Sequence, residues 1–462
     1  MLSLFLAVLL AVLNSAPSAQ PIFAEDGALD PRAEGVWYSR EKGWILQIDE
    51  SGVTRWQDTP EGCYASPAPD ESTPMMGQVE YRLFRPASEG DGIRLNYLPG
   101  DASAYFARLD SLPVQCGAED LSSETAVFDV FTAVMAQHYS FFDARGVNWD
   151  ALVAQARPHV HDGMGEAALW DVLAGLLEPL GDSHTKMVGL VNGEPRRAQA
   201  GLGTTLPMIR SGMGEGAWLN SLVDQLFNEV LDPGAELIAD RVIVGEITPE
   251  SGQLIGYIQI FTMGGFTNEH TPGSIAWSQA ELAALADMLD DALTRFADHQ
   301  AVIVDLSNNR GGYDAVTRAI AARFTDEAFL GYRVSVPGVP EADEDYPITP
   351  HDGVRYTGPV YLMTSDVTVS GGEITTLMMR TRPHVIQVGG TTRGAFSTPL
   401  AKPLPNGWYL ELSNEVFEDS EGHVYEGRGI PPVLAFDIYP EDAPVAGHRA
   451  AIERVVGLIE AG

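Results

Sequence analysis

The spacing of apolar residues along the chain first indicates strands. Between Gly35 and Cys116, short runs of alternating apolar and polar residues are separated by Gly, Asp and Ser. Alternation sends successive side chains to opposite faces, which is typical of half-buried strands. The runs read GVWYS, WILQI, YRLF, IRLNYL and AYFARL. The pattern predicts a small antiparallel β domain over residues 30–120, in which the tryptophans are expected to lie in the core.

The spacing becomes helical after this region. Apolar residues recur every three or four positions from Glu124, and helices are predicted there, over Trp149–Ala156 and over Glu166–Leu177. Gly181 ends the pattern. We therefore expect a helical segment over residues 121–190.

From Gly256 onward, strand and helix patterns alternate. GYIQIF, AVIVDLS, PVYLMTS and HVIQVG have the composition of buried strands, and amphipathic or helix-forming stretches lie between them. A hairpin is expected around Trp408–Tyr425. This order predicts a largely parallel sheet covered by helices, in an α/β domain over residues 191–462. No segment has the carboxylate-binding loop of a PDZ module.

The first residues have the pattern of a secretory signal peptide. An apolar run from Leu2 to Leu13 is followed by small residues, and it is too short to span a bilayer comfortably. The cationic start that such peptides usually have is missing, since no Lys or Arg precedes Arg32. We expect a signal peptide over about residues 1–24, export to the periplasm or outside the cell, and no stable membrane insertion.

The two cysteines of the chain, Cys63 and Cys116, both fall in the predicted β domain. In an exported protein a disulfide between them is expected, and two unpaired thiols are the alternative. Two thiols alone make no recognisable zinc site. We expect neither a metal nor an organic cofactor.

Charge excludes several classes of partner. The chain has 28 Lys and Arg against 64 Asp and Glu, so its formal net charge is −36. Binding to nucleic acid or to anionic lipid needs clustered cations, so neither is expected. Hydrophobic residues make up 45 %, which is enough for buried cores.

Two motifs have residues suited to a base and to backbone donors. GDSHT places His184 beside Ser183, although a lone His is usually structural or exposed. DLSNNRGG ends a predicted buried strand, where ligand sites of α/β sheets lie. Its Gly311 and Gly312 could turn N–H groups toward a substrate oxygen, or form an ordinary strand-to-helix turn.

Two further motifs could supply a nucleophile and an acid. In TSDVTVSGGE, Ser370 precedes a predicted helix whose free N–H groups, with that of Gly371, would favour an oxyanion. The alternatives are that Ser370 is an N-cap or that Ser365 is the nucleophile. In YEGRGIPP, Glu426 is either an orienting acid or a surface carboxylate. Together the four motifs follow the logic of a serine hydrolase, but the G-x-S-x-G elbow of α/β-hydrolases is absent.

These motifs, in this order, resemble the C-terminal-processing (tail-specific) serine protease family, in particular its tricorn-core-like branch. The resemblance covers about residues 125–435 and includes HYSFFDARGVNWDAL, LLEPLGDSHTKM and GGTTRGAFS. One variant of the family uses a Ser–Lys dyad, but Ala395 stands at the matching position and no Lys occurs between Lys186 and Lys402. The other variant uses a tetrad, to which Ser183, His184, Ser370 and Glu426 correspond. Ser307 departs from the family pattern, which often has Arg.

The resemblance implies a ClpP/crotonase-like spiral domain of ββα units and hydrolysis of peptide or protein substrates. Ser370 would attack the carbonyl, His184 would be the base, Glu426 with Ser183 would orient it, and Gly371 with Gly311 or Gly312 would hold the oxyanion. Because the family also contains retinoid-binding members, a non-catalytic carrier is an alternative. A hydrolase of non-peptide esters or amides is another.

Overall fold

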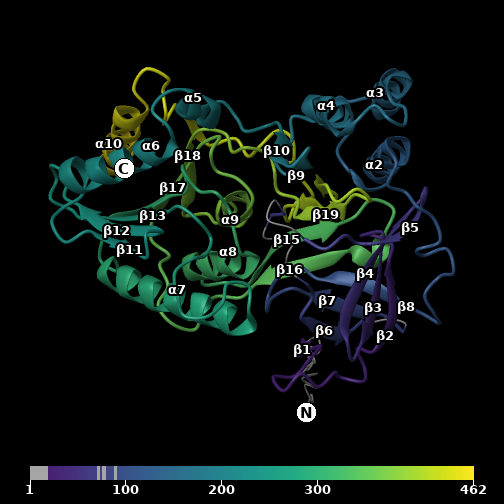
Figure 1. Ribbon diagram of the computed structural model, residues 1–462. Helices are drawn as coiled ribbons and strands as arrows, with labels where there is room; N and C mark the ends of the chain where they lie inside the picture. Colours follow the sequence, from purple (N-terminus) through teal and green to yellow (C-terminus); the bar gives the residue numbers. More distant parts are fainter. Residues whose placement is uncertain (1–18, 70–72, 75–79, 88–90) are drawn as a thin grey trace, which may run out of the picture.

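The computed structural model describes residues 19–69, 73–74, 80–87 and 91–462. Most of the predicted signal peptide, residues 1–18, lies outside the described residues. In Figure 1 a β region with three nearby helices occupies one side of the molecule, and a helix-covered sheet occupies the other. In the part of the chain that is described, no helix has the length and apolarity needed to cross a membrane.

The N-terminal region is an eight-stranded sheet with strand order β1-β6-β7-β8-β2-β3-β4-β5. All of its pairings are antiparallel, as predicted. The strands are β1 (Gln20–Pro21), β2 (Gly35–Ser39), β3 (Trp44–Asp49), β4 (Gly52–Thr59), β5 (Gly62–Ala65), β6 (Leu83–Pro86), β7 (Ile93–Asn96) and β8 (Ala104–Leu109). Trp37, Leu46 and Ile48 bury their side chains in its core.

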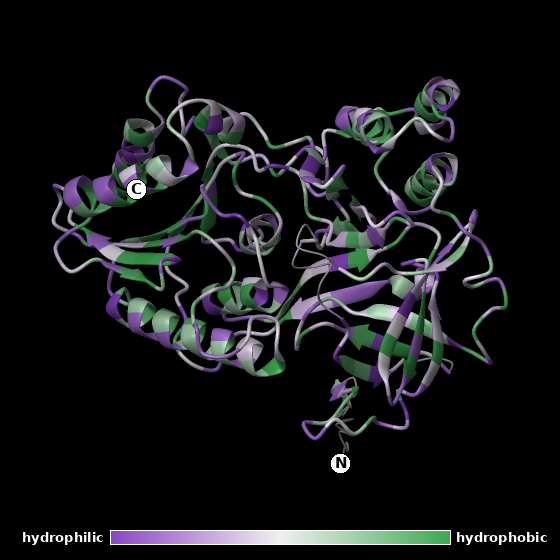
Figure 2. Ribbon diagram, in the orientation of Figure 1, coloured by the Kyte–Doolittle hydropathy of each residue, from purple (hydrophilic) through white to green (hydrophobic). Residues whose placement is uncertain are grey.

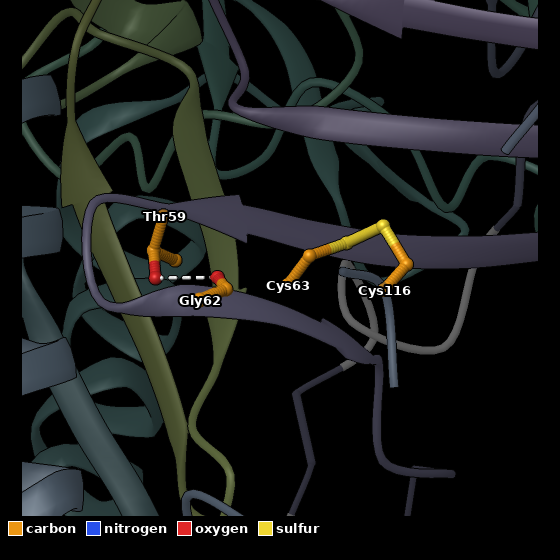
Figure 3. The surroundings of a disulfide bond; sticks show 4 residues. All are labelled: Thr59, Gly62, Cys63 and Cys116. Atoms are coloured by element: carbon orange, nitrogen blue, oxygen red, sulfur yellow. Dashed lines mark hydrogen bonds between the residues drawn. A yellow bond between two sulfur atoms is a disulfide. The ribbon is translucent and has the colours of Figure 1, made fainter. Parts of the chain in front are cut away.

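A disulfide joins Cys63, in β5, to Cys116, beyond β8, across a sequence separation of 53. Figure 3 shows the bond next to the β4–β5 turn, where the Thr59 hydroxyl donates to the Gly62 carbonyl at 2.8 Å. Gly117 N–H also donates to the Cys63 carbonyl at 2.8 Å. The end of the N-terminal region is thus fixed to one edge of its own sheet.

The predicted helices are present as α2 (Glu124–His138), α3 (Trp149–Ala156) and α4 (Glu166–Leu177). Ser123 and Asn148 cap α2 and α3 by accepting a backbone N–H, which satisfies a donor that the helix itself leaves free. One hydrophobic core joins these helices to the N-terminal sheet, through residues such as Phe131, Leu173 and Phe106. The β region and the helical segment therefore pack as one body.

A four-stranded antiparallel sheet connects the helical segment to the last third of the chain. Its order is β10-β9-β20-β19. The strands are β9 (Lys186–Val191), β10 (Glu194–Gln199), β19 (Pro399–Pro403) and β20 (Tyr409–Ser413). Within the hairpin predicted around Trp408–Tyr425, Glu418 makes an antiparallel bridge with Val424, but β21 (Val416–Glu418) does not pair with β20 and instead joins β15 (Phe329–Ser335) in another sheet. Both edges of β20 are already paired, with β9 and β19, so β21 finds no free edge there.

The α/β part is built on a seven-stranded sheet with order β11-β12-β13-β14-β17-β18-β22. Its strands are β11 (Glu236–Ile238), β12 (Val242–Ile247), β13 (Ile255–Ile260), β14 (Ala301–Asp305), β17 (Val360–Thr364), β18 (Val385–Gly389) and β22 (Leu434–Ala435). All pairings from β13 to β22 are parallel, as expected. The α/β class and the antiparallel N-terminal sheet are thus confirmed.

Helices cover both faces of this sheet (Figure 1). The helices α7 (Ile275–Arg295), α8 (Asp314–Ala321) and α9 (Gly371–Met379) pack on one face, and α5 (Thr205–Ser211), α6 (Glu215–Gln225) and α10 (Pro444–Ala461) on the other. In β14, Val302 and Val304 belong to the first core, and Ala301 and Ile303 to the second. Because both faces are buried, the central strands are mostly apolar (Figure 2), although they also bury Gln259, Asp305 and Gln387.

The N-terminal region lies against the α/β part through charged side chains. Arg85 pairs with Glu344 at 2.5 Å in β16 (Glu344–Ile348), which belongs to the three-stranded sheet β16-β15-β21. Lys42 pairs with Glu415 at 2.6 Å, and both side chains are nearly buried. Breaking the Lys42–Glu415 contact would leave a nearly buried charge without its partner, which is unfavourable.

The disulfide is expected to stabilise the N-terminal region. In Cys63→Ala/Cys116→Ala, urea denaturation should give an unfolding free energy lower by about 2–4 kcal/mol, because the unfolded chain is no longer cross-linked. Reductant should destabilise the wild-type protein equally and leave the variant unchanged. Equal stability of variant and wild type would contradict this role.

Candidate active site

Ser370 lies where two neighbouring parallel strands end. The strand β14 leads into residues 305–312 and β17 leads into residues 364–370, and these strands pair directly. Ser370 precedes α9 with φ 56° and ψ −123°, a conformation that residues with a side chain rarely adopt. Its N–H donates to the Ala395 carbonyl at 3.0 Å, and its own carbonyl accepts from Glu373 N–H at 2.8 Å. Such strain costs about 1–3 kcal/mol and is frequent at functional sites.

The paired glycines lie against Ser370. A β-carbon added to Gly311 would be 2.6 Å from the Ser370 β-carbon, so only glycine fits there. Gly311 N–H donates to Asn309 Oδ1 at 2.8 Å and is therefore occupied. Among residues of the described ranges, no acceptor faces the N–H of Gly312 or of Gly371. Of the two predicted glycines, the geometry favours Gly312 as a donor beside Gly371.

His184 stands in a turn between the helical segment and β9. Asp182 makes this turn, because its carboxylate accepts His184 N–H at 2.9 Å and the Thr185 hydroxyl at 2.8 Å. His184 Nδ1 lies 2.6 Å from the Ser397 carbonyl. A carbonyl only accepts, so Nδ1 carries the proton and Nε2 is the acceptor nitrogen. Burial lowers the pKa of His184 to about 4, against the opposing charge of Asp182.

A single cavity of about 600 Å³ brings these groups together. His184, Ser370, Gly311 and Gly312 all contribute to its lining, although more than 120 residues separate His184 from the glycines in the chain. The N-terminal sheet contributes the opposite wall, including Trp44, which the sequence predicts as a core residue.

Glu426 is buried behind the cavity and reaches His184 indirectly. Its Oε2 accepts Phe396 N–H at 2.8 Å and Ser397 N–H at 3.1 Å, and the carbonyl of Ser397 holds the His184 ring. Burial, with the charge of Asp182, raises the pKa of Glu426 to about 8, against the pull of the Phe396 N–H and Arg145. Glu426 thus orients the peptide that orients His184.

Ser183 does not link Glu426 to His184. Its hydroxyl is buried and has no hydrogen-bond partner in the described part of the chain. Its carbonyl accepts from the Gln199 side chain. Of the two residues predicted to orient His184, Glu426 is connected to the His184 ring through Ser397.

The sequence assigned no role to Arg145, which connects the base to the acid. Its guanidinium donates to the Gly181 carbonyl at 2.7 Å and to Glu426 Oε1 at 3.1 Å. It also lies 3.6 Å from Asp182 Oδ1. Although burial opposes it, Arg145 and His184 hold the pKa of Asp182 below its ordinary value. One fixed cation therefore joins the turn of His184 to the loop of Glu426.

Glu373, in the first turn of α9, is a second unassigned carboxylate. It accepts Gly394 N–H at 2.6 Å and Ala395 N–H at 2.8 Å. Burial raises its pKa to about 7. Because the Ala395 carbonyl holds Ser370 N–H, Glu373 braces the strained nucleophile from behind.

The alternative nucleophile Ser365 and the two lysines nearest in sequence to a possible dyad have other partners. The Ser365 hydroxyl donates to the Ser307 carbonyl at 2.5 Å and accepts Val367 N–H at 3.0 Å. Lys402 Nζ is buried against Gln57 Oε1 at 3.3 Å, in the N-terminal core. Lys186 lines the cavity but is paired with Glu411, which lies directly opposite on β20.

No group of His, Cys, Asp and Glu side chains in the described ranges has an arrangement that could hold a metal ion. This arrangement suits general-base catalysis, in which the His184 imidazole accepts the proton of the Ser370 hydroxyl and free backbone N–H groups bind the oxyanion.

Replacing Arg145 should disturb the site from a distance. In Arg145→Met, the Asp182 and Glu426 carboxylates face each other without a cation, and we expect a loss of about 3–5 kcal/mol in unfolding free energy. The control is Arg157→Met, which removes an exposed pair with Asp129 and should cost about 0–1 kcal/mol. Urea denaturation compares the two, and an equal effect would contradict the role of Arg145.

Comparison with known proteins gives a family for part of the chain and a fold. Residues 254–435, which include Ser370 and Glu426 but not His184, match the Peptidase family S41 profile. No curated protein matches the chain. A candidate peptidase from Parabacteroides merdae is 23 % identical with a TM-score of 0.56, over 73 % of this chain and 97 % of its own.

Mature CPAF, in complex with lactacystin, shares the fold at lower identity. It is 12 % identical with a TM-score of 0.53, over 74 % of this chain and 99 % of its own. These two likenesses concern the fold, and the match of residues 254–435 supplies the family. Residues 254–435 therefore form a domain of peptidase family S41, the part of the chain by which it is a serine-type peptidase.

Proposed function

We propose that this peptidase is an exported endopeptidase that cleaves peptide bonds through an acyl-enzyme on Ser370, with His184 as general base. The observation that carries the proposal is the shared cavity, which the strained Ser370, His184 and Gly312 all line. No other serine that the sequence suggested combines exposure to this cavity with an unusual backbone.

In the proposed reaction, His184 Nε2 takes the Ser370 proton as the oxygen attacks the carbonyl carbon of the scissile peptide. The N–H groups of Gly312 and Gly371 bind the oxyanion that develops. His184 then gives its proton to the leaving amine. In deacylation, His184 takes a proton from the water molecule that attacks the acyl-enzyme, and it returns this proton to the Ser370 oxygen as the acid product leaves.

Glu426 is proposed to act as an orienting group and not as a proton acceptor. Its hydrogen bonds to Phe396 and Ser397 fix the carbonyl that holds Nδ1–H, so the tautomer needed for base catalysis is preformed. Export is proposed from the N-terminal apolar run, and the disulfide between Cys63 and Cys116 is consistent with an oxidising compartment.

Substitution of the nucleophile tests the assignment. We expect Ser370→Ala to lower kcat on a peptide substrate by at least about 10³-fold and to abolish labelling by a fluorophosphonate probe. Ser365→Ala is the matched control and should still be labelled. Retained peptidase activity in folded Ser370→Ala would contradict the proposal.

The pH profile should report the low pKa of His184. The imidazole is an effective base only when neutral, which it is above a pKa of about 4. We therefore expect kcat/KM to fall on the acid side with an apparent pKa near 4, well below the ordinary His value of about 6.5. The measurement is kcat/KM between about pH 3.5 and 8, with circular dichroism confirming that the protein stays folded. An acid limb near 6.5 would contradict the buried geometry.

A further inference from the structure

The N-terminal sheet and the α/β part close the cavity together. Trp44, Tyr81 and Tyr97 line it from the N-terminal side, and Trp277 and Tyr313 line it from the other. The cavity that contains Ser370 thus has aromatic rings in both of its walls, and the faces of such rings attract organic cations.

Two carboxylates face each other across this boundary. The Asp101 loop packs on the start of α8, since the Tyr313 hydroxyl donates to the Pro99 carbonyl and a β-carbon on Gly100 would be 2.9 Å from that of Ala315. Asp101 and Asp314 both line the cavity. Burial and the charge of Asp314 raise the pKa of Asp101 well above its ordinary value.

Neither carboxylate has a cation in contact among the described residues. Arg318 attracts both from a longer distance, but its Nη1 donates to the Tyr332 hydroxyl. Two partly buried carboxylates that lie close together repel each other, and a proton or an added cation relieves the repulsion.

A third carboxylate adds an unused acceptor. Glu415 lines the same cavity, is 5 % exposed and pairs with Lys42 through Oε1 at 2.6 Å. Its Oε2 has no hydrogen-bond partner within the part of the chain that is described. Burial and the charge of Glu415 raise the pKa of Asp314, against the pull of Arg318, so these groups share one electrostatic environment.

The carboxylates and aromatic rings of the cavity indicate which kind of side chain it would bind. The described residues offer no donor set for a metal ion. A Lys or Arg side chain would supply both a cation for the carboxylates and an aliphatic stem for the aromatic walls. A purely apolar side chain would leave the carboxylates unpaired.

We propose that this cavity binds a lysine or arginine side chain of the peptide substrate, with its cationic group between Asp101 and Asp314. The inference rests on the proposed peptidase function and names its substrate class: peptides with a basic residue at a set position from the scissile bond.

The test compares peptides that differ in a single side chain. A peptide library with Lys, norleucine or Glu at each position around the scissile bond is digested by the full-length protein. Norleucine has the lysine stem without the ammonium group. At one position we expect kcat/KM for Lys to exceed that for norleucine by about 100-fold or more, because the two partly buried carboxylates otherwise have no cation in contact.

Variants connect the preference to the residues. Asp101→Asn and Asp314→Asn should each lower the Lys-to-norleucine ratio by about 10-fold or more while cleavage of the norleucine peptide is kept. Asp171→Asn, at an exposed pair with Arg196, is the control and should keep the wild-type ratio.

The outcomes separate the inference from the function on which it rests. Equal cleavage of Lys and norleucine peptides, a preference for norleucine, or an equal loss on both peptides in the Asp variants would overturn the specificity while Ser370 is still labelled. Absence of both labelling and cleavage would overturn the peptidase mechanism itself.

Discussion

The pairing of β9 with β20 determines whether the candidate site exists. The strand β9 starts two residues after His184, and its Lys186 lies opposite Glu411 of β20, more than 200 residues later in the chain. This register brings the His184 turn next to Ser397, the residue that holds its ring. Without the pairing, the base and the nucleophile would belong to separate parts of the molecule.

Charge interactions and burial then determine the protonation states of the groups around the site. Arg145 is the cation that joins the His184 turn to the Glu426 loop, and it compensates two carboxylates that would otherwise repel each other. The same burial that makes these interactions strong keeps His184 neutral at physiological pH. A neutral imidazole with a fixed tautomer is what a serine nucleophile requires.

The N-terminal region belongs to the enzyme in a functional sense. It shares a hydrophobic core with the helical segment, and its loops form a wall of the cavity that contains Ser370. A cavity lined from two sides can select a side chain by charge and shape. We therefore propose that the region contributes to substrate choice, although no residue in it is proposed to take part in bond breaking.

The local pattern of apolar and polar residues was enough to predict many of the secondary-structure elements. Alternation and helical spacing predicted the N-terminal strands, the helices α2 to α4 and the α/β order, because these depend on neighbours in sequence. The motifs also singled out Ser370 and His184. Tertiary structure alone decided the pairing of β20, the role of Arg145 and the meeting of Asp101 with Asp314. Those contacts join residues far apart in the chain, and no short-range periodicity records which distant charges or strand edges will meet.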